Sequence, residues 1–249
     1  MKSAAKTDSG LKRNQNQDTV FQSASGVGPL PNLFMVADGM GGHRGGGYCS
    51  RTLIERICSC LGQSGDRIPV RALRRAVEEA NFSLYQESLR QESLSGMGST
   101  LVAAFYEDDT LYVFNIGDSR LYVMDEEDPV PRQITRDHSY VEEMVKAGRM
   151  QRGSEVYNRN KNIITRAVGI SPRIEMDMFE VPLREHSLVM LCTDGLTNML
   201  SDEEIGCILR EHLSPEEAVD QLVQAANHQG GADNISVVLF RPGEKEASL

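Results

Sequence analysis

The feature that most constrains the fold is a change of hydrophobic period about two fifths of the way along the 249-residue chain. Before it, apolar residues recur every three or four positions over 48–61 and 70–84, as on one face of a helix. After it, segments 100–107, 110–117 and 119–125 are typical of consecutive antiparallel strands separated by turns. Strands that come in runs, with helices in pairs, indicate an α+β layered domain.

The rest of the chain supports this class. A helix is expected over 139–148, followed by a polar, aperiodic segment at 149–162 that we interpret as a mobile surface loop. Two capping boxes predict the starts of two further helices, and they pair Ser201 with Glu204 and Ser214 with Glu217. Additional strands are expected at 19–22, 33–37, 176–183, 187–193 and 234–240.

Charge and composition limit the possible partners. The formal net charge is −10, which disfavours binding to nucleic acid or to an anionic membrane. No stretch approaches the roughly 18 apolar residues of a membrane span, and the N-terminus lacks the apolar centre of a signal peptide. The five cysteines form no C-x-x-C pair, so we expect reduced thiols and a cytoplasmic location. No linker or repeat divides the chain, and a single domain over 1–249 is therefore predicted.

The glycine-rich stretch VADGMGGHRGGG at 36–47 raises the question of chemistry. It is not a P-loop, because no lysine follows its glycines, and it also departs from the dinucleotide fingerprint G-x-G-x-x-G. Asp38 follows an apolar run and precedes Gly39, a pair that elsewhere is most often a tight hairpin turn. Here no returning strand follows directly, which weakens that interpretation.

The same arrangement of an acid near a strand end, with small residues beside it, recurs along the chain. The acids concerned are Asp18, Asp38, Asp118, Asp194 and Asp233. Two carboxylates about 4 Å apart repel by roughly 4 kcal/mol at an effective dielectric of 20, so a converging set needs cations or protons. Oxygen-only ligands favour hard ions, and the calcium loop motif is absent. A dispersed Mg²⁺ or Mn²⁺ centre, which could activate water for attack on a phosphoryl group, is the better hypothesis.

Taken together, these segments resemble the metal-dependent serine/threonine protein phosphatases of the PPM, or type-2C, family in their compact bacterial form. The blocks come in the family's order and span residues 10–240. They are GLKRNQNQD at 10–18, VADGMGGH at 36–43, GSTLVAA at 98–104, NIGDSR at 115–120, RDHS at 136–139, CTDGL at 192–196 and GADNISVV at 231–238.

The resemblance implies a four-layer α/β/β/α sandwich around two central antiparallel sheets, with a core over about 5–242 and a variable flap over about 139–165. It also implies two Mg²⁺ or Mn²⁺ ions at one end of the sandwich. Asp38 would bridge them and the Gly39 carbonyl would bind one, while Asp194 and Asp233 would complete the other site. Asp118 matches a third, weaker metal position of bacterial members.

Further roles follow from the same resemblance. Asp18 would orient water at the metals, without binding them directly, and Asn234 would support Asp233 through hydrogen bonds. Arg13 matches the arginine that binds the substrate phosphate, where a guanidinium suits a dianion.

Two positions depart from the family pattern. Gln17 stands where many members have glutamate, which removes a charge beside the metals. Met40 stands where the eukaryotic branch has a histidine proposed as general acid, so His43 becomes a candidate proton donor to the leaving oxygen. A structural role for His43, or a water as the donor, is the competing interpretation, and His138 is expected to be structural.

The function implied is hydrolysis of phosphoserine and phosphothreonine in proteins by a water activated at a binuclear centre, without a covalent intermediate. The partners would be the phosphorylated substrates of a cognate serine/threonine kinase, and a monomer is expected. A non-catalytic phosphopeptide- or partner-binding module of the same fold is the alternative, and a hydrolase of small phosphate esters is a third possibility.

Overall fold

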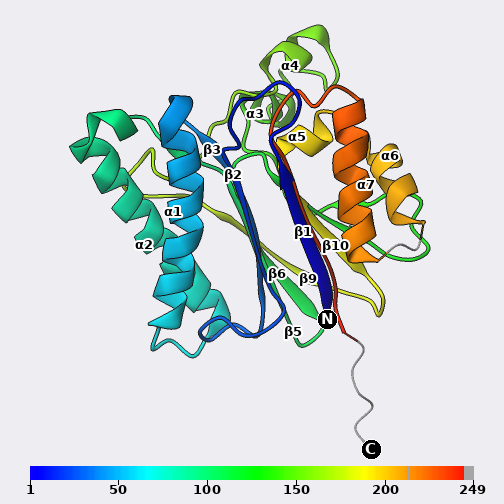
Figure 1. Ribbon diagram of the computed structural model, residues 1–249, viewed down its shortest axis with the longest axis horizontal. Helices are drawn as coiled ribbons and strands as arrows, with labels where there is room; N and C mark the ends of the chain where they lie inside the picture. The colour runs from blue at the N-terminus through cyan, green and yellow to red at the C-terminus, as the bar shows by residue number, and fades with distance from the viewer. Residues whose placement is uncertain (212–213, 244–249) are drawn as a thin grey trace, which may run out of the picture.

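The protein is built from two antiparallel β-sheets stacked face to face, with helices on the outer face of each sheet (Figure 1). The computed structural model describes residues 1–211 and 214–243, apart from the side chains of residues 42–44. The α+β, four-layer arrangement expected from the sequence is confirmed.

The first sheet has the strand order β1-β11-β10-β7-β8 and the second has the order β2-β3-β5-β6-β9, with β4 pairing with β3. The first sheet consists of β1 (Lys2–Asp8), β11 (Ile235–Arg241), β10 (Leu188–Cys192), β7 (Arg120–Met124) and β8 (Arg132–Gln133). The second consists of β2 (Asp18–Ser23), β3 (Leu33–Met40), β4 (Gly98–Ser99), β5 (Leu101–Glu107), β6 (Thr110–Ile116) and β9 (Asp177–Pro182).

Two long helices cover the second sheet, and three helices near the C-terminal half cover the first (Figure 1). The helices are α1 (Gly42–Gly62), α2 (Pro69–Arg90), α3 (Tyr140–Lys146), α4 (Glu155–Asn160), α5 (Asp194–Thr197), α6 (Asp202–Leu209) and α7 (Pro215–His228), with a 3₁₀ turn at Glu92–Leu94. Both predicted capping boxes are present, at the starts of α6 and α7.

Alternation along β3 shows how one strand serves two cores. Leu33, Met35 and Ala37 face α1 and α2, whereas Phe34 and Val36 face the other sheet. Between the sheets the rings of Phe34 and Phe240 stack with centroids 3.9 Å apart. Because successive side chains of a strand point to opposite faces, an unbroken apolar run is what a strand buried on both faces requires.

Three elements differ from the sequence-based expectation. β1 was not predicted, because the segment KSAAKTD is polar and only Ala4 is fully buried in this edge strand. β7 does not continue the sheet of β5 and β6 but crosses to the other sheet and pairs with β10. The segment 149–162, expected to be a loop throughout, contains the short helix α4, which begins at the cap residue Ser154.

Gly39 lies in β3, and the glycines of 42–47 form the first turns of α1, which begins at Gly42 and not at residue 48 as expected. They allow the helix to approach β3 very closely. A Cβ on Gly39 would lie 2.1 Å from the carbonyl oxygen of Gly46, and a Cβ on Gly46 would lie 2.5 Å from that of Gly39. Only glycine fits at both positions, so the helix start is held against the end of β3.

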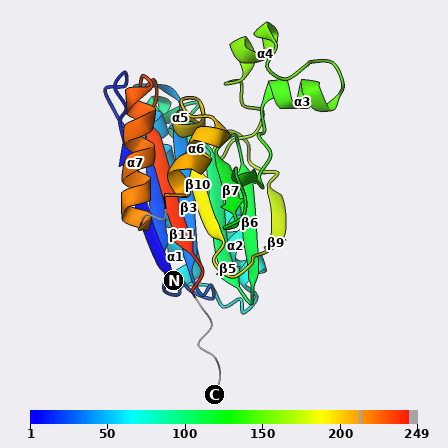
Figure 2. The same ribbon diagram turned by 90° about the vertical axis from the view of Figure 1, so that its right-hand side faces the viewer.

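The segment 139–165, which we call the flap, carries α3 and α4 and projects from the sandwich (Figure 2). It lies at the end opposite the N-terminus (Figure 1). Within the described ranges, none of the helices combines the length and apolar character needed to cross a membrane.

Candidate active site

Strand pairing brings the five predicted acids to one end of the sandwich. Asp18 begins β2 directly opposite Asp38 near the end of β3. Asp118 lies in the connection that follows β6, Asp194 follows β10, and Asp233 precedes β11. β2 and β3 are antiparallel neighbours in one sheet, and β10 and β11 are in the other, so in each pair an acid near the start of one strand lies near an acid at the end of the next. The stacking of the two sheets brings both pairs and Asp118 to the same end of the sandwich.

A cavity of about 810 Å³ opens at this end, and four of the acids line it. Its wall also includes Gly39, Met40, Lys12 and Arg13, together with Asn162 and Ile164 from the flap. Asp18 lies behind this wall, where it is 8% exposed. Met40 therefore does line the site, as its place beside Asp38 suggested, but it offers no proton donor.

Burial acts strongly on these carboxylates. It raises the pKa of Asp118 to about 8, with the charge of Asp194 adding to the effect. Burial also raises the pKa of Asp38 well above its usual range, and the negative charge of Asp18 raises it further. The pKa of Asp194 is raised by burial and by Asp233, while a hydrogen bond from Asn198 acts in the opposite direction. Such a group of acids is costly to ionise without a nearby positive charge.

The chemistry of these donors fits hard divalent cations. Three carboxylate oxygens, Oδ1 of Asp18, Asp118 and Asp194, are buried and have no hydrogen-bond partner in the structure. Among the described residues, no three His, Cys, Asp or Glu side chains form a ready-made metal cluster, so the acids are dispersed around the cavity. Unpartnered buried carboxylate oxygens are nonetheless the ligands that Mg²⁺ and Mn²⁺ prefer.

Arg13 lies on the loop between β1 and β2, at the rim of the cavity. Its Nη2 donates to Oδ2 of Asp233 at 2.7 Å, and this contact is the main reason why the pKa of Arg13 is raised. The guanidinium remains about half exposed, so it can also reach a ligand in the cavity.

Asn234 makes the expected hydrogen bond to Asp233, but from its backbone. Its side chain does not support the carboxylate of Asp233, which instead accepts from the Asn234 backbone N–H at 2.8 Å. The amide donates to the carbonyl oxygens of Ser9 and Gln15 and accepts from the backbone of Gln17. The Asn234 side chain therefore holds the loop that carries Arg13, because each of its three hydrogen bonds goes to that loop.

Of the two histidines considered, only His138 has a described side chain. The side chain of His43, the candidate proton donor, lies outside the described part of the structure. His138 is buried; its Nδ1 accepts from the backbone N–H of Gly117, and its Nε2 lies 3.3 Å from Asp177. Burial lowers the pKa of His138, which matches a neutral ring held in place between the flap and the sheet.

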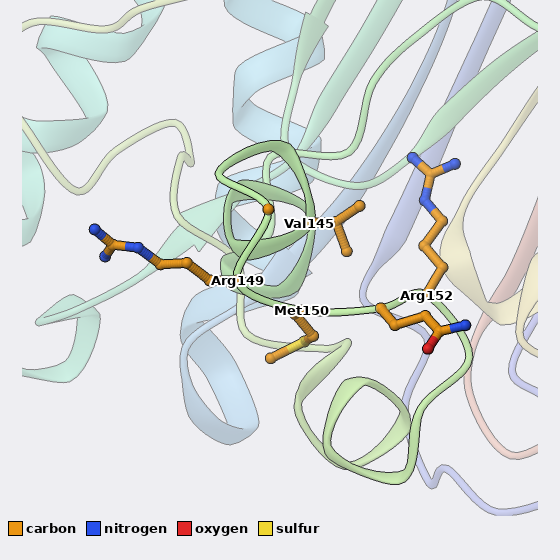
Figure 3. Close-up of a pocket in the computed structure, with 6 residues that line it drawn as sticks. Val145, Arg149, Met150 and Arg152 are labelled. Carbon is orange, nitrogen blue, oxygen red and sulfur yellow. The ribbon is translucent and has the colours of Figure 1, made fainter.

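Two other hollows differ from this cavity in the charges that line them. A shallow one of about 660 Å³ on the flap includes Val145, Arg149, Met150 and Arg152, and the two labelled arginines point away from each other (Figure 3). Another, of about 610 Å³, lies under the flap, where the charged groups pair among themselves, as Arg120 does with Asp137. Neither shares a residue with the acid-lined cavity.

Two hydroxyl residues at the site were missed by the sequence analysis. Thr193 and Ser236 both donate to Oδ2 of Asp18, at 2.8 and 2.7 Å. These bonds lower the pKa of Asp18, but burial outweighs them and raises it to about 7. The signal was present in the sequence, since each hydroxyl lies within three residues of a predicted ligand, in the segments CTDGL and GADNISVV.

Known proteins are similar to this chain in sequence and structure over nearly its full length. A family model described as protein phosphatase 2C matches residues 10–239. The serine/threonine phosphatase stp of Listeria monocytogenes is 35% identical over 242 residues, which cover 94% of this chain and 93% of the relative.

Two solved structures are also similar. The serine/threonine phosphatase PstP/Ppp of Mycobacterium tuberculosis has a TM-score of 0.85 and 30% identity, covering 98% of this chain and 99% of the other. The catalytic domain of PstP in complex with two manganese ions has a TM-score of 0.79 and 31% identity, covering 96% of each chain.

Proposed function

The chain belongs to the protein phosphatase 2C, or PPM, family of serine/threonine phosphatases, and from this we propose that it hydrolyses phosphoserine and phosphothreonine at a binuclear Mg²⁺ or Mn²⁺ centre. The observation that carries the proposal is the set of acids around one cavity, with buried carboxylate oxygens that no donor in the described part of the chain satisfies. The manganese complex of PstP, a protein with the same fold, supports this choice of metal.

In this proposal Asp38, the carbonyl of Gly39, Asp194 and Asp233 hold two ions, and Asp118 serves a weaker third. When bound, such ions would lower the pKa of a water molecule and polarise the phosphoryl group for in-line attack. The positive charge would also offset the burial and the mutual repulsion that together raise the pKa of Asp38 and Asp194.

The chain's own side chains supply the remaining functions. Arg13 binds the phosphate dianion from the rim, where its exposed guanidinium can make two parallel hydrogen bonds. Asp18 orients the attacking water, because its Oδ1 is an acceptor to which none of the described protein groups donates. His43 is our candidate for protonating the leaving serine or threonine oxygen. No covalent intermediate is needed, since water is the nucleophile.

A non-catalytic phosphopeptide-binding module is not favoured. Recognition of a phosphate by Arg13 alone would not require five acids at the same end of the molecule, which weaken the binding of an anion. Their presence is explained if metal ions reverse the sign of the local field.

The wider biological context follows from the same proposal. The substrates would be phosphorylated proteins, those of a cognate serine/threonine kinase, and the flap would contact them through Asn162 and Ile164, which line the cavity. We propose that residues 1–249 act as one catalytic domain, monomeric and in the cytoplasm, with no nucleic acid or membrane as partner.

The test is release of phosphate from a phosphothreonine peptide, with Mn²⁺ and then with excess EDTA. We expect Mn²⁺-dependent turnover that EDTA abolishes, and a loss of at least about 100-fold in kcat for Asp194→Asn. Asp220→Asn is the matched control, because this acid lies on the surface in an ion pair with Lys6. Absence of Mn²⁺-dependent turnover, or equal activity of the two variants, would refute the proposal, and faster hydrolysis of free nucleotides would redirect it to small phosphate esters.

A further inference from the structure

The two carboxylate oxygens of Asp18 have different surroundings. Oδ2 accepts two hydrogen bonds, from Thr193 Oγ1 at 2.8 Å and from Ser236 Oγ at 2.7 Å. Oδ1 is buried and has no hydrogen-bond partner among the described residues. Because the donors all lie on one oxygen, they set the rotation of the carboxylate and so the direction of the other oxygen.

The direction of the hydrogen bonds behind Ser236 can be deduced by counting protons. A serine or threonine hydroxyl has one proton to donate. Ser236 uses its proton on Asp18, so in the 2.7 Å contact between Thr7 and Ser236 the donor must be Thr7. Thr7 can then only accept from its other neighbour, Nδ2 of Asn16, which lies 2.7 Å away and is a donor.

The amide of Asn16 is oriented by its second contact. Its Oδ1 accepts from the backbone N–H of Asp18 at 3.1 Å, an Asx-type turn that leaves Nδ2 to face Thr7. The hydrogen bonds therefore form a closed ring that runs from the Asp18 backbone through Asn16, Thr7 and Ser236 to the carboxylate of Asp18. Every donor in the ring is used once.

Thr193 is tied to the same ring from the other side. Its Oγ1 accepts a hydrogen bond from the backbone N–H of Ser236 at 3.0 Å and donates one to Oδ2 of Asp18. Both hydroxyls at the carboxylate are fully buried, so no solvent competes for these bonds. In such surroundings successive hydrogen bonds polarise and strengthen one another.

We infer that Thr7, Asn16, Thr193 and Ser236 are positioning residues for Asp18: the ring holds Oδ2 and thereby directs the unpartnered Oδ1 to accept a hydrogen bond from the attacking water. This inference rests on the function proposed above. The ring also joins the Asp18 carboxylate to the loop that carries Arg13, since Asn16 belongs to that loop.

Two matched pairs of substitutions test the ring. Thr193→Val keeps the shape but removes the donor to Asp18, whereas Thr193→Ser keeps the hydroxyl. At the exposed Thr7, Thr7→Val and Thr7→Ser do the same with little risk to folding. Thr110→Val is the control for replacing threonine by valine as such, because the hydroxyl that it removes lies at the start of β6 and bonds to the Asp108 carbonyl.

With a phosphothreonine peptide and saturating Mn²⁺, we expect Thr193→Val to lower kcat about 10- to 100-fold while KM changes less than about 3-fold. Thr193→Ser should recover most of that loss. If Thr193 acts through Asp18, adding Thr193→Val to Asp18→Asn should lower kcat by less than about 2-fold further. Equal rates for the Val and Ser variants, or losses that multiply fully in the double variant, would overturn the inference.

A second measurement does not depend on catalysis and separates failure of the ring from failure of the proposed function. In the EDTA-treated protein, the side-chain amide protons of Asn16 are followed by NMR. Thr7→Val should shift these resonances by losing their acceptor, and Thr7→Ser should leave them near the wild-type position. If the shifts are unchanged in Thr7→Val the ring does not exist, whatever the activity; if they change as expected in an inactive protein, only the proposed function fails.

Discussion

Substitution of Gly46 by alanine tests the link between the glycine-rich helix start and the metal site. A Cβ at this position would lie 2.5 Å from the carbonyl oxygen of Gly39 and 2.9 Å from the backbone nitrogen of Met40. Cβ contacts below 3.0 Å are essentially never seen, and those below 3.4 Å are rare. The Gly39 carbonyl, or the helix that presses on it, must therefore move by 0.5 to 0.9 Å to reach those limits.

The Gly46→Ala substitution should have two opposite effects on stability and one effect on metal binding. Alanine is favoured over glycine inside a helix by about 1 kcal/mol, while overpacking costs about 1–3 kcal/mol, so the net destabilisation is about 0–2 kcal/mol. Metal ligands, however, must lie within about 0.2 Å of their ideal distance. A shift several times larger should weaken Mn²⁺ binding about 10- to 100-fold, the range seen when the support of a ligand is lost.

The control is Gly47→Ala, one residue further along the same helix. Its Cβ would have its nearest neighbour at 3.5 Å, an ordinary contact, so this variant should gain about 0.5–1 kcal/mol and bind Mn²⁺ normally. Titration calorimetry measures Mn²⁺ affinity, thermal unfolding measures stability, and activity is assayed across Mn²⁺ concentrations. We expect Gly46→Ala to be inactive at limiting Mn²⁺ and partly restored by excess. Mn²⁺ affinity equal to that of Gly47→Ala would refute the reasoning about the Gly39 carbonyl.

Three further outcomes are expected. Because burial raises the pKa of Asp118 to about 8, ionisation of this acid should cost the EDTA-treated protein stability progressively as pH rises from about 4 to about 8. Asp118→Asn should flatten this part of the stability profile, and an unchanged slope in chemical denaturation would contradict the assignment. Asn234→Ala should free the loop around Arg13 and raise KM for the peptide about 10-fold, with a loss of about 1–3 kcal/mol in unfolding free energy. Arg13→Ala should raise KM more than it lowers kcat; an unaltered KM in steady-state kinetics would exclude a phosphate contact.

Local patterns of sequence were enough for many elements. The apolar run at 33–37, the two helical repeats before residue 98 and the capping boxes at Ser201 and Ser214 all correspond to observed elements. These signals concern residues within one or two turns or within one strand, so neighbours in sequence decide them. The order of the motif blocks also indicated the family, because each block retains its own chemistry.

Local patterns do not determine how segments that are distant in the sequence pair. β1 carries a weak pattern and forms only because β11, more than two hundred residues later, offers it an edge. The crossing of β7 to the other sheet depends on where β10 lies, which the segment 119–125 does not encode. Local hydrophobic period cannot distinguish two sheets that share one core.

At the site, the sequence by itself determined which groups are available: the five aspartates, Arg13 and the glycines. The tertiary structure decided what each one contacts. The Asn234 side chain binds the Arg13 loop while only its backbone donates to the neighbouring carboxylate, and the glycines of 42–47 form a helix start pressed against β3. Hydrogen-bond partners such as Ser236 for Asp18 are 218 positions apart, and only the packing of the two sheets brings them within 2.7 Å. A residue's chemistry is local, but its partners are chosen by the fold.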